Sequence, residues 1–252
     1  MIFDTNIHVT VDEKWDNKIK KNKFKDIIDN YKKNKLKGFC AVGINNLGSY
    51  NHSKFINIIK KYKFIHPVAG FNLQNNIENE FEEVSKLGFK SIKIHPRASN
   101  LTLSEIDLEK IVNYANKYKM NLLICTYFNS NLNRTYYEDP KYILAKNLKN
   151  LKTKSVLMHG GCERILEFAE LIRFNNNIFL DLSLTLMKYE FSSVDNDIKY
   201  LFHNYDKKIM IGSDWPEINY KKFIKRIKFF SKNLNKEKRS NIYFKNAFSV
   251  FS

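Results

Sequence analysis

Five short stretches of the sequence contain side chains that can bind a metal ion or move a proton. They carry histidine, aspartate, cysteine or lysine at close spacing: Asp4-Thr-Asn6-Ile-His8, Lys93-Ile-His95-Pro-Arg97, Cys125-Thr126, His159-Gly-Gly161 and Gly212-Ser-Asp214-Trp-Pro216. Imidazole, carboxylate and thiolate groups are the usual protein ligands of zinc, and the first two also serve as general acids and bases. The sequence therefore predicts metal or acid–base chemistry, provided that one fold brings these stretches together.

Eight short apolar stretches of strand type supply the elements that must position these side chains. We predict strands at Met1–Asp4, Phe39–Ile44, His66–Phe71, Phe89–His95, Leu122–Thr126, Ser155–His159, Ile178–Leu182 and Lys208–Gly212. Segments with apolar residues at helical spacing lie between them. This alternation indicates a parallel sheet, and eight such units in about 250 residues favour an α/β fold of the (β/α)₈ TIM-barrel type. We find no linker or change of composition, so residues 1–252 are expected to form one domain.

The barrel model predicts where the reactive side chains meet. Active sites of such barrels lie at the C-terminal ends of the strands, so the five stretches should converge at one mouth. Because side chains alternate along a strand, Asp4, Asn6 and His8 should share one face of the first strand. By the same rule, Lys93 and His95 should lie opposite the neighbouring isoleucines. The remaining histidines are expected to be structural: His52, His66 and His203.

The composition limits the class of protein and its partners. The 14% of aromatic residues excludes a disordered chain, and three scattered cysteines are too few for a disulfide framework. No apolar stretch reaches the length of a membrane span, and the N-terminus lacks the pattern of a secretory signal. We therefore expect a cytoplasmic protein. The net charge of +17 is carried mostly by lysines distributed through every helix, so we interpret it as a solvated surface. An anionic ligand or partner is the alternative, and a nucleic-acid partner is unlikely.

Taken in order, the motifs resemble those of the amidohydrolase superfamily, in its amidohydrolase-related (amidohydrolase 2) branch. That family opens with Asp-x-His-x-His, which is similar to Asp4-Thr-Asn-Ile-His8. Its fourth strand often reads Gly-x-Lys-Gly-Ile-Lys-Leu-His-Pro, its sixth ends in His-Gly-Gly, and its eighth reads Gly-Ser-Asp-x-Pro. The matching stretches here are Gly88–Pro96, His159–Gly161 and Gly212–Pro216. The resemblance runs from residue 2 to residue 251.

The resemblance implies a hydrolase in which a divalent metal, commonly zinc, activates water. Asp214 would then be both metal ligand and base, His159 would orient or polarise the substrate, and His95 would belong to the same catalytic group. Two positions depart from the family: Asn6 and Cys125 stand where histidines are usual. Asn is a poor zinc ligand and Cys a good one, so the metal set would be His8, Cys125 and Asp214. The other possibility is that no metal is bound.

The family also includes metal-independent lactonases that bind their substrates with basic side chains. Lys93, Arg97 and Asn6 are the predicted substrate-binding residues, and Arg134 and Arg164 on later loops could contribute in the same way. The sequence thus favours hydrolysis of an amide, ester or lactone bond in a small, carboxylated substrate. Three alternatives stay open: a metal-independent lactonase, a decarboxylase of the same superfamily, and a non-catalytic barrel. A nuclease branch fits less well because its eighth strand typically reads Glu-Thr-Asp. A homo-oligomer is possible.

Overall fold

Eight parallel strands form a barrel in the computed structural model, which describes residues 1–15, 21–99, 103–128 and 139–252. The strands pair in chain order: β1 (Phe3–His8), β2 (Gly38–Val42), β3 (Ile65–Gly70), β4 (Ser91–Ile94), β5 (Asn121–Cys125), β6 (Ser155–Met158), β7 (Ile178–Asp181) and β8 (Ile209–Met210). Backbone hydrogen bonds join the first strand to the last, with Asp214 donating to Asn6 over 2.9 Å. The (β/α)₈ prediction is confirmed.

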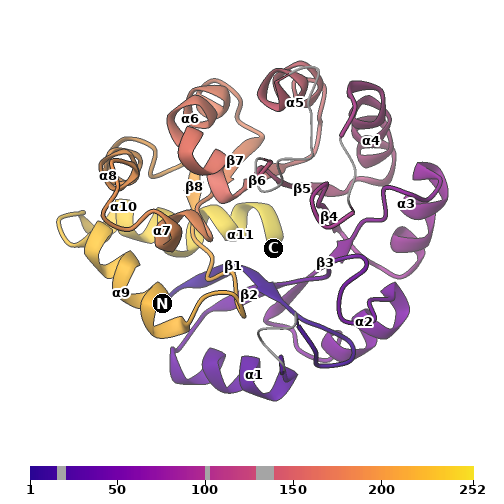
Figure 1. Ribbon diagram of the computed structural model, residues 1–252, viewed down its shortest axis with the longest axis horizontal. Helices are drawn as coiled ribbons and strands as arrows, with labels where there is room; N and C mark the ends of the chain where they lie inside the picture. Colours follow the sequence, from indigo (N-terminus) through magenta and orange to yellow (C-terminus); the bar gives the residue numbers. More distant parts are fainter. Residues whose placement is uncertain (16–20, 100–102, 129–138) are drawn as a thin grey trace.

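Helices surround the barrel in the order that the βα alternation requires (Figure 1). They are α1 (Phe24–Lys33), α2 (His52–Ile59), α3 (Ile77–Lys86), α4 (Glu105–Tyr118), α5 (Pro140–Leu148), η1 (His159–Arg164), α6 (Ile165–Arg173), α7 (Thr185–Lys188), α8 (Val194–Asn204), α9 (Tyr220–Ser231), α10 (Lys236–Ser240), η2 (Asn241–Lys245) and α11 (Asn246–Phe251). Six begin at an Asn, Ser or Asp whose side chain accepts a backbone N–H, as an N-cap does: Asn51, Asn76, Ser104, Asp139, Asn219 and Asn235. Among the described residues, no helix has the length and apolar character needed to cross a membrane.

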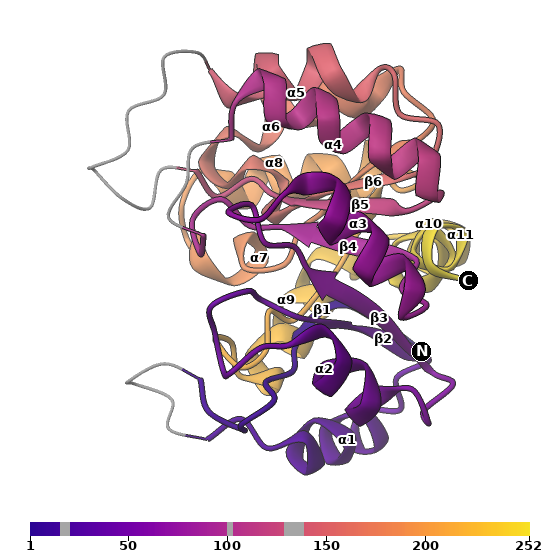
Figure 2. The ribbon, with the colours of Figure 1, turned by 90° about the vertical axis from the view of Figure 1, so that its right-hand side faces the viewer.

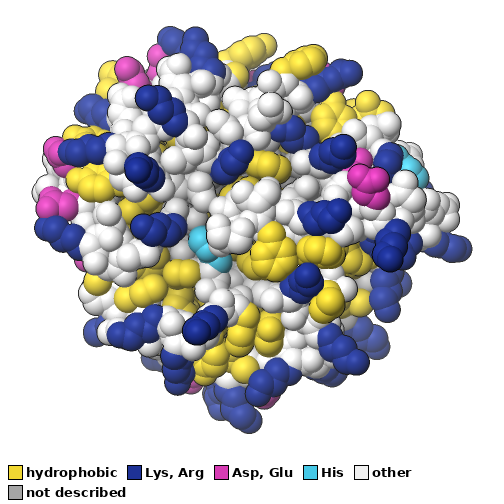
Figure 3. Space-filling model, turned by 180° about the vertical axis from the view of Figure 1, so that it is seen from behind, with side chains coloured by type: hydrophobic (Ala, Val, Ile, Leu, Met, Phe, Trp, Pro, Cys, Tyr) yellow, Lys and Arg dark blue, Asp and Glu magenta, His cyan; other side chains and the backbone are white. Residues whose placement is uncertain are grey.

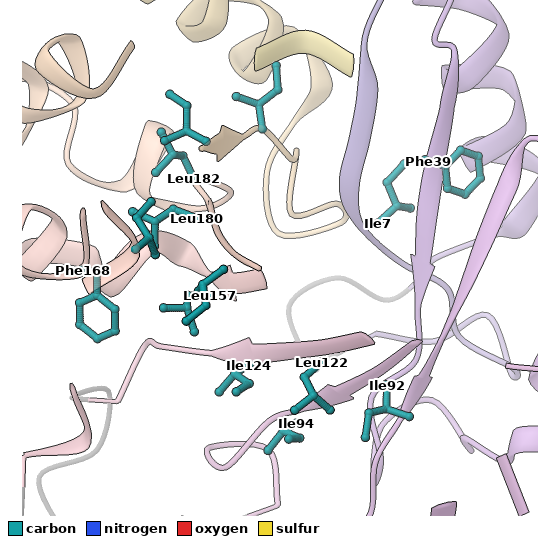
Figure 4. Packing of buried hydrophobic residues seen from close by; sticks show 14 of the residues in the cluster. Ile7, Phe39, Ile92, Ile94, Leu122, Ile124, Leu157, Phe168, Leu180 and Leu182 are labelled. Atoms are coloured by element: carbon teal, nitrogen blue, oxygen red, sulfur yellow. The ribbon is translucent and has the colours of Figure 1, made fainter. Parts of the chain in front are cut away.

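Two apolar layers hold the barrel together. Alternate strand residues such as Ile92, Leu122 and Leu180 face the helices and form the larger layer (Figure 4). A smaller cluster consists of interior side chains together with α11 and includes Cys40, Val42, Val68, Leu123, Val156, Met158, Phe179 and Met210. Phe251 of α11 stacks on Phe3 at 6.0 Å between ring centroids. Helix α11 and both termini therefore lie at the end of the barrel where the strands begin (Figure 2).

The first strand differs most from its prediction. It begins at Phe3 and continues to His8, so the reactive side chains lie within the strand and not after it. Between Asp4 and Ile7 the register with β2 shifts by one residue, which is a β-bulge. The bulge breaks the strict alternation on which the predicted common face of Asp4, Asn6 and His8 depended.

Basic side chains are dispersed over the surface. Figure 3 shows the end of the barrel opposite to the view in Figure 1, where Lys and Arg side chains are scattered over the face with few acidic ones between them. They do not gather into one stripe on this face. This distribution agrees with the interpretation of the high charge as a solvated surface.

Candidate active site

Asp214 and His8 form the centre of the candidate site, at the junction of β8 and β1. Both side chains are buried, and Nε2 of His8 lies 3.4 Å from Oδ1 of Asp214. The other ring nitrogen of His8 lies 3.3 Å from the carbonyl oxygen of Val42. Asp214 has φ of 59°, a left-handed conformation that is uncommon outside glycine and concentrates at functional sites.

Asn6 links three parts of the site through one amide group. Its Nδ2 donates to Oδ1 of Asp214 over 2.5 Å and to the hydroxyl of Ser183 over 3.1 Å. Its Oδ1 accepts from Nζ of Lys93 over 3.4 Å. Because a lysine ammonium can only donate, these partners determine which end of the amide carries the hydrogens. The predicted residues Asn6, His8, Lys93 and Asp214 therefore lie in one connected group.

His159 joins this group from β6 through a strained turn. His159 has φ of 68°, and Gly160, Gly161 and Cys162 that follow it also have positive φ. The N–H at Nδ1 of His159 lies 3.1 Å from the carbonyl oxygen of Ser183, which can only accept. A neutral His159 therefore carries its hydrogen on Nδ1 and a lone pair on Nε2.

His95 has the opposite tautomer. The backbone N–H of Ala98 donates to Nδ1 of His95 over 3.2 Å, so a neutral ring carries its hydrogen on Nε2. His95 and Lys93 are buried on the inner side of β4, while Ile92 and Ile94 pack in the layer toward the helices, as predicted. The site thus contains one imidazole that can donate at Nε2 and one that can accept there.

Cys125 and the predicted arginines differ in their surroundings. Cys125 is buried at the end of β5, and burial raises the pKa of its thiol although the charge of Lys93 opposes that shift. The guanidinium of Arg97 lies over the ring of Tyr127, 5.3 Å from its centroid. Arg164 instead pairs with Asp139 and Glu167 and is occupied by them. Arg134 lies outside the described residues.

Two further residues support the site and were not predicted from the sequence. Asp181, at the end of β7, accepts hydrogen bonds from the hydroxyls of Thr5 and Ser183, and Ser183 in turn contacts Asn6 and Nδ1 of His159. Burial raises the pKa of Asp181 to about 6, although these hydrogen bonds oppose the shift. The signal available in the sequence was Leu180-Asp-Leu-Ser183, in which two polar residues alternate with leucines at a strand end.

Asp4 does not join its predicted partners at the mouth. Beyond the bulge its carboxylate accepts from the hydroxyl of Tyr220 on α9 and from the backbone N–H of Ser213. Burial raises the pKa of Asp4 to about 6, against the effect of these donors. Its role is to fasten β1 to the segment after β8, which carries Asp214.

The electrostatics favour a carboxylate at Asp214, while burial opposes a positive charge on each imidazole around it. Burial acts to raise the pKa of Asp214, but the hydrogen bond with His8 and the charges of His159, His8 and Lys93 outweigh it and lower the pKa. Burial, together with the charge of Lys93, lowers the pKa of His8 and of His95, and it lowers that of His159 to about 4. Burial also lowers the pKa of Lys93, against the attraction of Cys125, Asp214 and Asp181.

The donor arrangement at the mouth does not suit a zinc ion. A zinc site needs at least three protein ligands. Among the described residues, His8 and Asp214 are not accompanied by a third His, Cys, Asp or Glu ligand atom at metal-ligand spacing. Asn6 turns its NH₂ group toward Asp214, and the ammonium of Lys93 is nearby. The predicted set of His8, Cys125 and Asp214 is therefore not assembled as a ligand group.

The one group with ligand spacing in the described part of the chain lies away from His8 and Asp214. His52, Glu80 and Glu83 place their ligand atoms within 4.8 Å of one another and could hold a metal ion. The first two are already bonded, because Nε2 of His52 lies 3.0 Å from Oε1 of Glu80 and Nδ1 lies 2.9 Å from the hydroxyl of Tyr50. Glu80 also accepts from Asn72 and Asn75. This group ties the loops after β2 and β3 together.

Known structures share this architecture over nearly the whole chain. No protein-family model and no curated protein sequence matches the sequence of this chain. A probable 2-pyrone-4,6-dicarboxylic acid hydrolase from Acinetobacter baumannii, with citric acid bound, is 15% identical with a TM-score of 0.72, covering 99% of this chain and 98% of that one. This chain and that protein share the TIM-barrel fold.

Two more structures support this identification of the fold. An uncharacterized TIM-barrel protein from Bordetella bronchiseptica is 15% identical, with a TM-score of 0.78 over 99% of this chain and 97% of that one. An amidohydrolase from Burkholderia multivorans with bound zinc is 12% identical, with a TM-score of 0.70 over 100% of this chain and 99% of that one. At such identities the likeness establishes the fold and leaves activity and metal use to be argued from the residues.

Proposed function

We propose that this chain is a hydrolase that cleaves a lactone, ester or amide bond of a small carboxylated substrate, with Asp214 as general base. The observation that carries the proposal is the state of Asp214. It is a buried carboxylate with a lowered pKa, held between His8 and Asn6 in a left-handed backbone conformation. Buried ionisable groups in strained backbone positions cluster at catalytic sites, and the lowered pKa keeps this carboxylate in the ionised form that can accept a proton.

Asp214 would take a proton from the attacking water molecule. Its Oδ1 lies 3.4 Å from Nε2 of His8, a separation across which the proton can be passed on before it reaches the leaving group. Asn6 holds the same oxygen at 2.5 Å and so fixes the direction of the carboxylate. Asp214, His8 and Asn6 together would position the water molecule and receive its proton.

The two imidazole tautomers suit two different partners in the reaction, the carbonyl oxygen of the substrate and the attacking water molecule. Nε2–H of His95 can donate to the substrate carbonyl oxygen and to the oxyanion that forms from it. Nε2 of His159 has a lone pair and can accept from the water molecule. This assignment reverses the expectation that His159 polarises the substrate, since a neutral ring bonded through Nδ1 to Ser183 has no hydrogen to offer at Nε2.

The positive charges of the site favour an anionic substrate. Lys93 is buried beside Asn6, and Arg97 stands two residues beyond His95 on the exposed rim. Guanidinium and ammonium groups pair well with carboxylates. The neighbouring structure with citric acid bound, and its description as a hydrolase of a pyrone dicarboxylic acid, support a carboxylated cyclic ester as the first substrate to test.

A screen of small carboxylated lactones, esters and amides tests the proposal. General acid–base help contributes about 10² to 10⁴ in rate, so Asp214→Asn should lower kcat by at least about 10²-fold on any substrate found. His95→Gln should lower kcat for the same substrate. Asp29→Asn on the exposed face of α1 is the matched control and should keep full activity. A folded Asp214→Asn protein with wild-type turnover would refute the proposal.

A further inference from the structure

Lys93 is a lysine inside the barrel, and its burial requires an explanation. Its side chain is only 1% exposed, and it is among the largest fully buried side chains of the protein. The residues before and after it face the helices, so the inward direction of Lys93 follows from the pleat of β4. Burying an ammonium group costs several kcal/mol unless an opposite charge and hydrogen bonds compensate for it.

Asp214 supplies the opposite charge through Asn6. Lys93 donates to the amide oxygen of Asn6, and the amide nitrogen donates to the carboxylate of Asp214. An amide between a cation and an anion is polarised in one direction, with its oxygen toward the ammonium and its NH₂ toward the carboxylate. This orientation turns the NH₂ group of Asn6 toward Asp214, and an amide NH₂ offers no ligand atom to a metal ion there.

The amidohydrolase from Burkholderia multivorans, which has the same fold, has zinc bound. Here the donors around His8 and Asp214 lack a third ligand at metal spacing within the described residues, while a protein cation is present. We propose that the ammonium of Lys93 is the resident cation of this site and balances the charge of Asp214 in place of a divalent metal. The inference concerns the charge of the site and holds whichever substrate is used.

Thermal unfolding with and without zinc tests this assignment by a measurement of Tm that does not depend on enzymatic activity. Lys93→Met keeps the length and apolar stem of the side chain but leaves Asp214 without its balancing charge. Leaving the buried carboxylate of Asp214 without that charge should lower Tm by on the order of 10 °C in the presence of a chelator. Lys90→Met, an exposed lysine just before the same strand, is the matched control and should leave Tm unchanged.

A double variant keeps the test decisive if Lys93→Met folds poorly. Asp214→Asn removes the charge that Lys93 balances, so the variant with both substitutions should recover most of the Tm lost in Lys93→Met. Zinc should raise the Tm of Lys93→Met, since a cation is then missing, and should not raise that of the wild type. A Lys93→Met protein as stable as Lys90→Met, or a double variant without recovery, would overturn the assignment.

Metal content gives an independent measurement. The purified wild-type protein should hold well below one equivalent of zinc after gel filtration. One equivalent of zinc that is lost in His8→Ala would overturn the proposal, because the metal would then occupy the mouth. Zinc that persists in His8→Ala and is lost in Glu83→Gln belongs to the group of His52, Glu80 and Glu83 and leaves the assignment of Lys93 intact.

Discussion

Replacing His159 with asparagine should change how the stability of the protein depends on pH. Burial and the charge of Lys93 lower the pKa of His159 from 6.5 to about 4 in the folded protein. Asparagine is the suitable replacement because it tolerates the positive φ of this position and can still donate to the carbonyl oxygen of Ser183. The substitution therefore removes the titrating ring with little change to the turn.

The direction in which stability changes with pH depends on whether the folded or the unfolded state binds the proton more tightly. Below pH 6.5 the unfolded chain protonates His159 while the folded protein does not until about pH 4, so the wild type loses stability as pH falls through this interval. At about 1.4 kcal/mol for each pKa unit, the full loss is about 3 kcal/mol. Asp4 and Asp181, whose pKa values burial raises to about 6, act in the opposite direction because folding favours their protonated form as pH falls. Comparing wild type with variant cancels their contribution.

Urea unfolding at several pH values between 7.5 and 4 measures the effect. The stability difference between wild type and His159→Asn should shrink, or reverse, by about 3 kcal/mol toward the acid end. His203→Asn, at an exposed position on α8, is the control for the exchange of histidine for asparagine, because this substitution leaves the buried ring of His159 in place. A constant difference for His159→Asn over the same range would refute the account of a buried neutral imidazole.

Three further pairs of substitutions, each a test with its matched control, measure how much buried contacts around the barrel contribute to stability. Gly161→Ala and Gly88→Ala both place alanine at positive φ, which costs about 1–2 kcal/mol, but only at Gly161 would the new Cβ lie 2.1 Å from the ring of Phe168. Urea unfolding should therefore show a clearly larger loss of stability for Gly161→Ala, and equal losses would contradict the packing argument. Tyr220→Phe removes a donor from the buried carboxylate of Asp4 and should cost about 1–3 kcal/mol by the same measurement, while Tyr200→Phe on the half-exposed face of α8 should cost little. Arg226→Met leaves Asp195 and the carbonyl oxygen of Leu186 without their buried donor and should cost about 3 kcal/mol, whereas Arg173→Met at an exposed ion pair should stay within about 1 kcal/mol of wild type.

The sequence alone determined the strands, their parallel order and the ends at which chemistry was to be sought. Local periodicity suffices for this, because alternation along a strand and the spacing of a helix are visible within a few residues. The inward direction of Lys93 and His95 between outward isoleucines was predictable for the same reason. The stretches ending in His8, His159 and Asp214 were recognisable as motifs before any contact was known.

Only the tertiary structure decided how those side chains are combined. Asn6 and Asp214 lie 208 residues apart in the sequence, and Thr5 and Asp181 lie 176 apart, so their hydrogen bonds exist only because the barrel closes between its first and last strands. The bulge in β1 turned Asp4 away from the predicted group, and a one-residue change of register has no signature in a hydrophobic pattern. The tautomers of His95 and His159 were decided by the backbone N–H of Ala98 and the backbone carbonyl of Ser183. Every residue type has such backbone groups, so the sequence does not indicate which of them a histidine will contact. Burial of Lys93 beside Asn6 is likewise a property of the packed interior, where the cost of an isolated charge is reduced by polar partners that come from other strands.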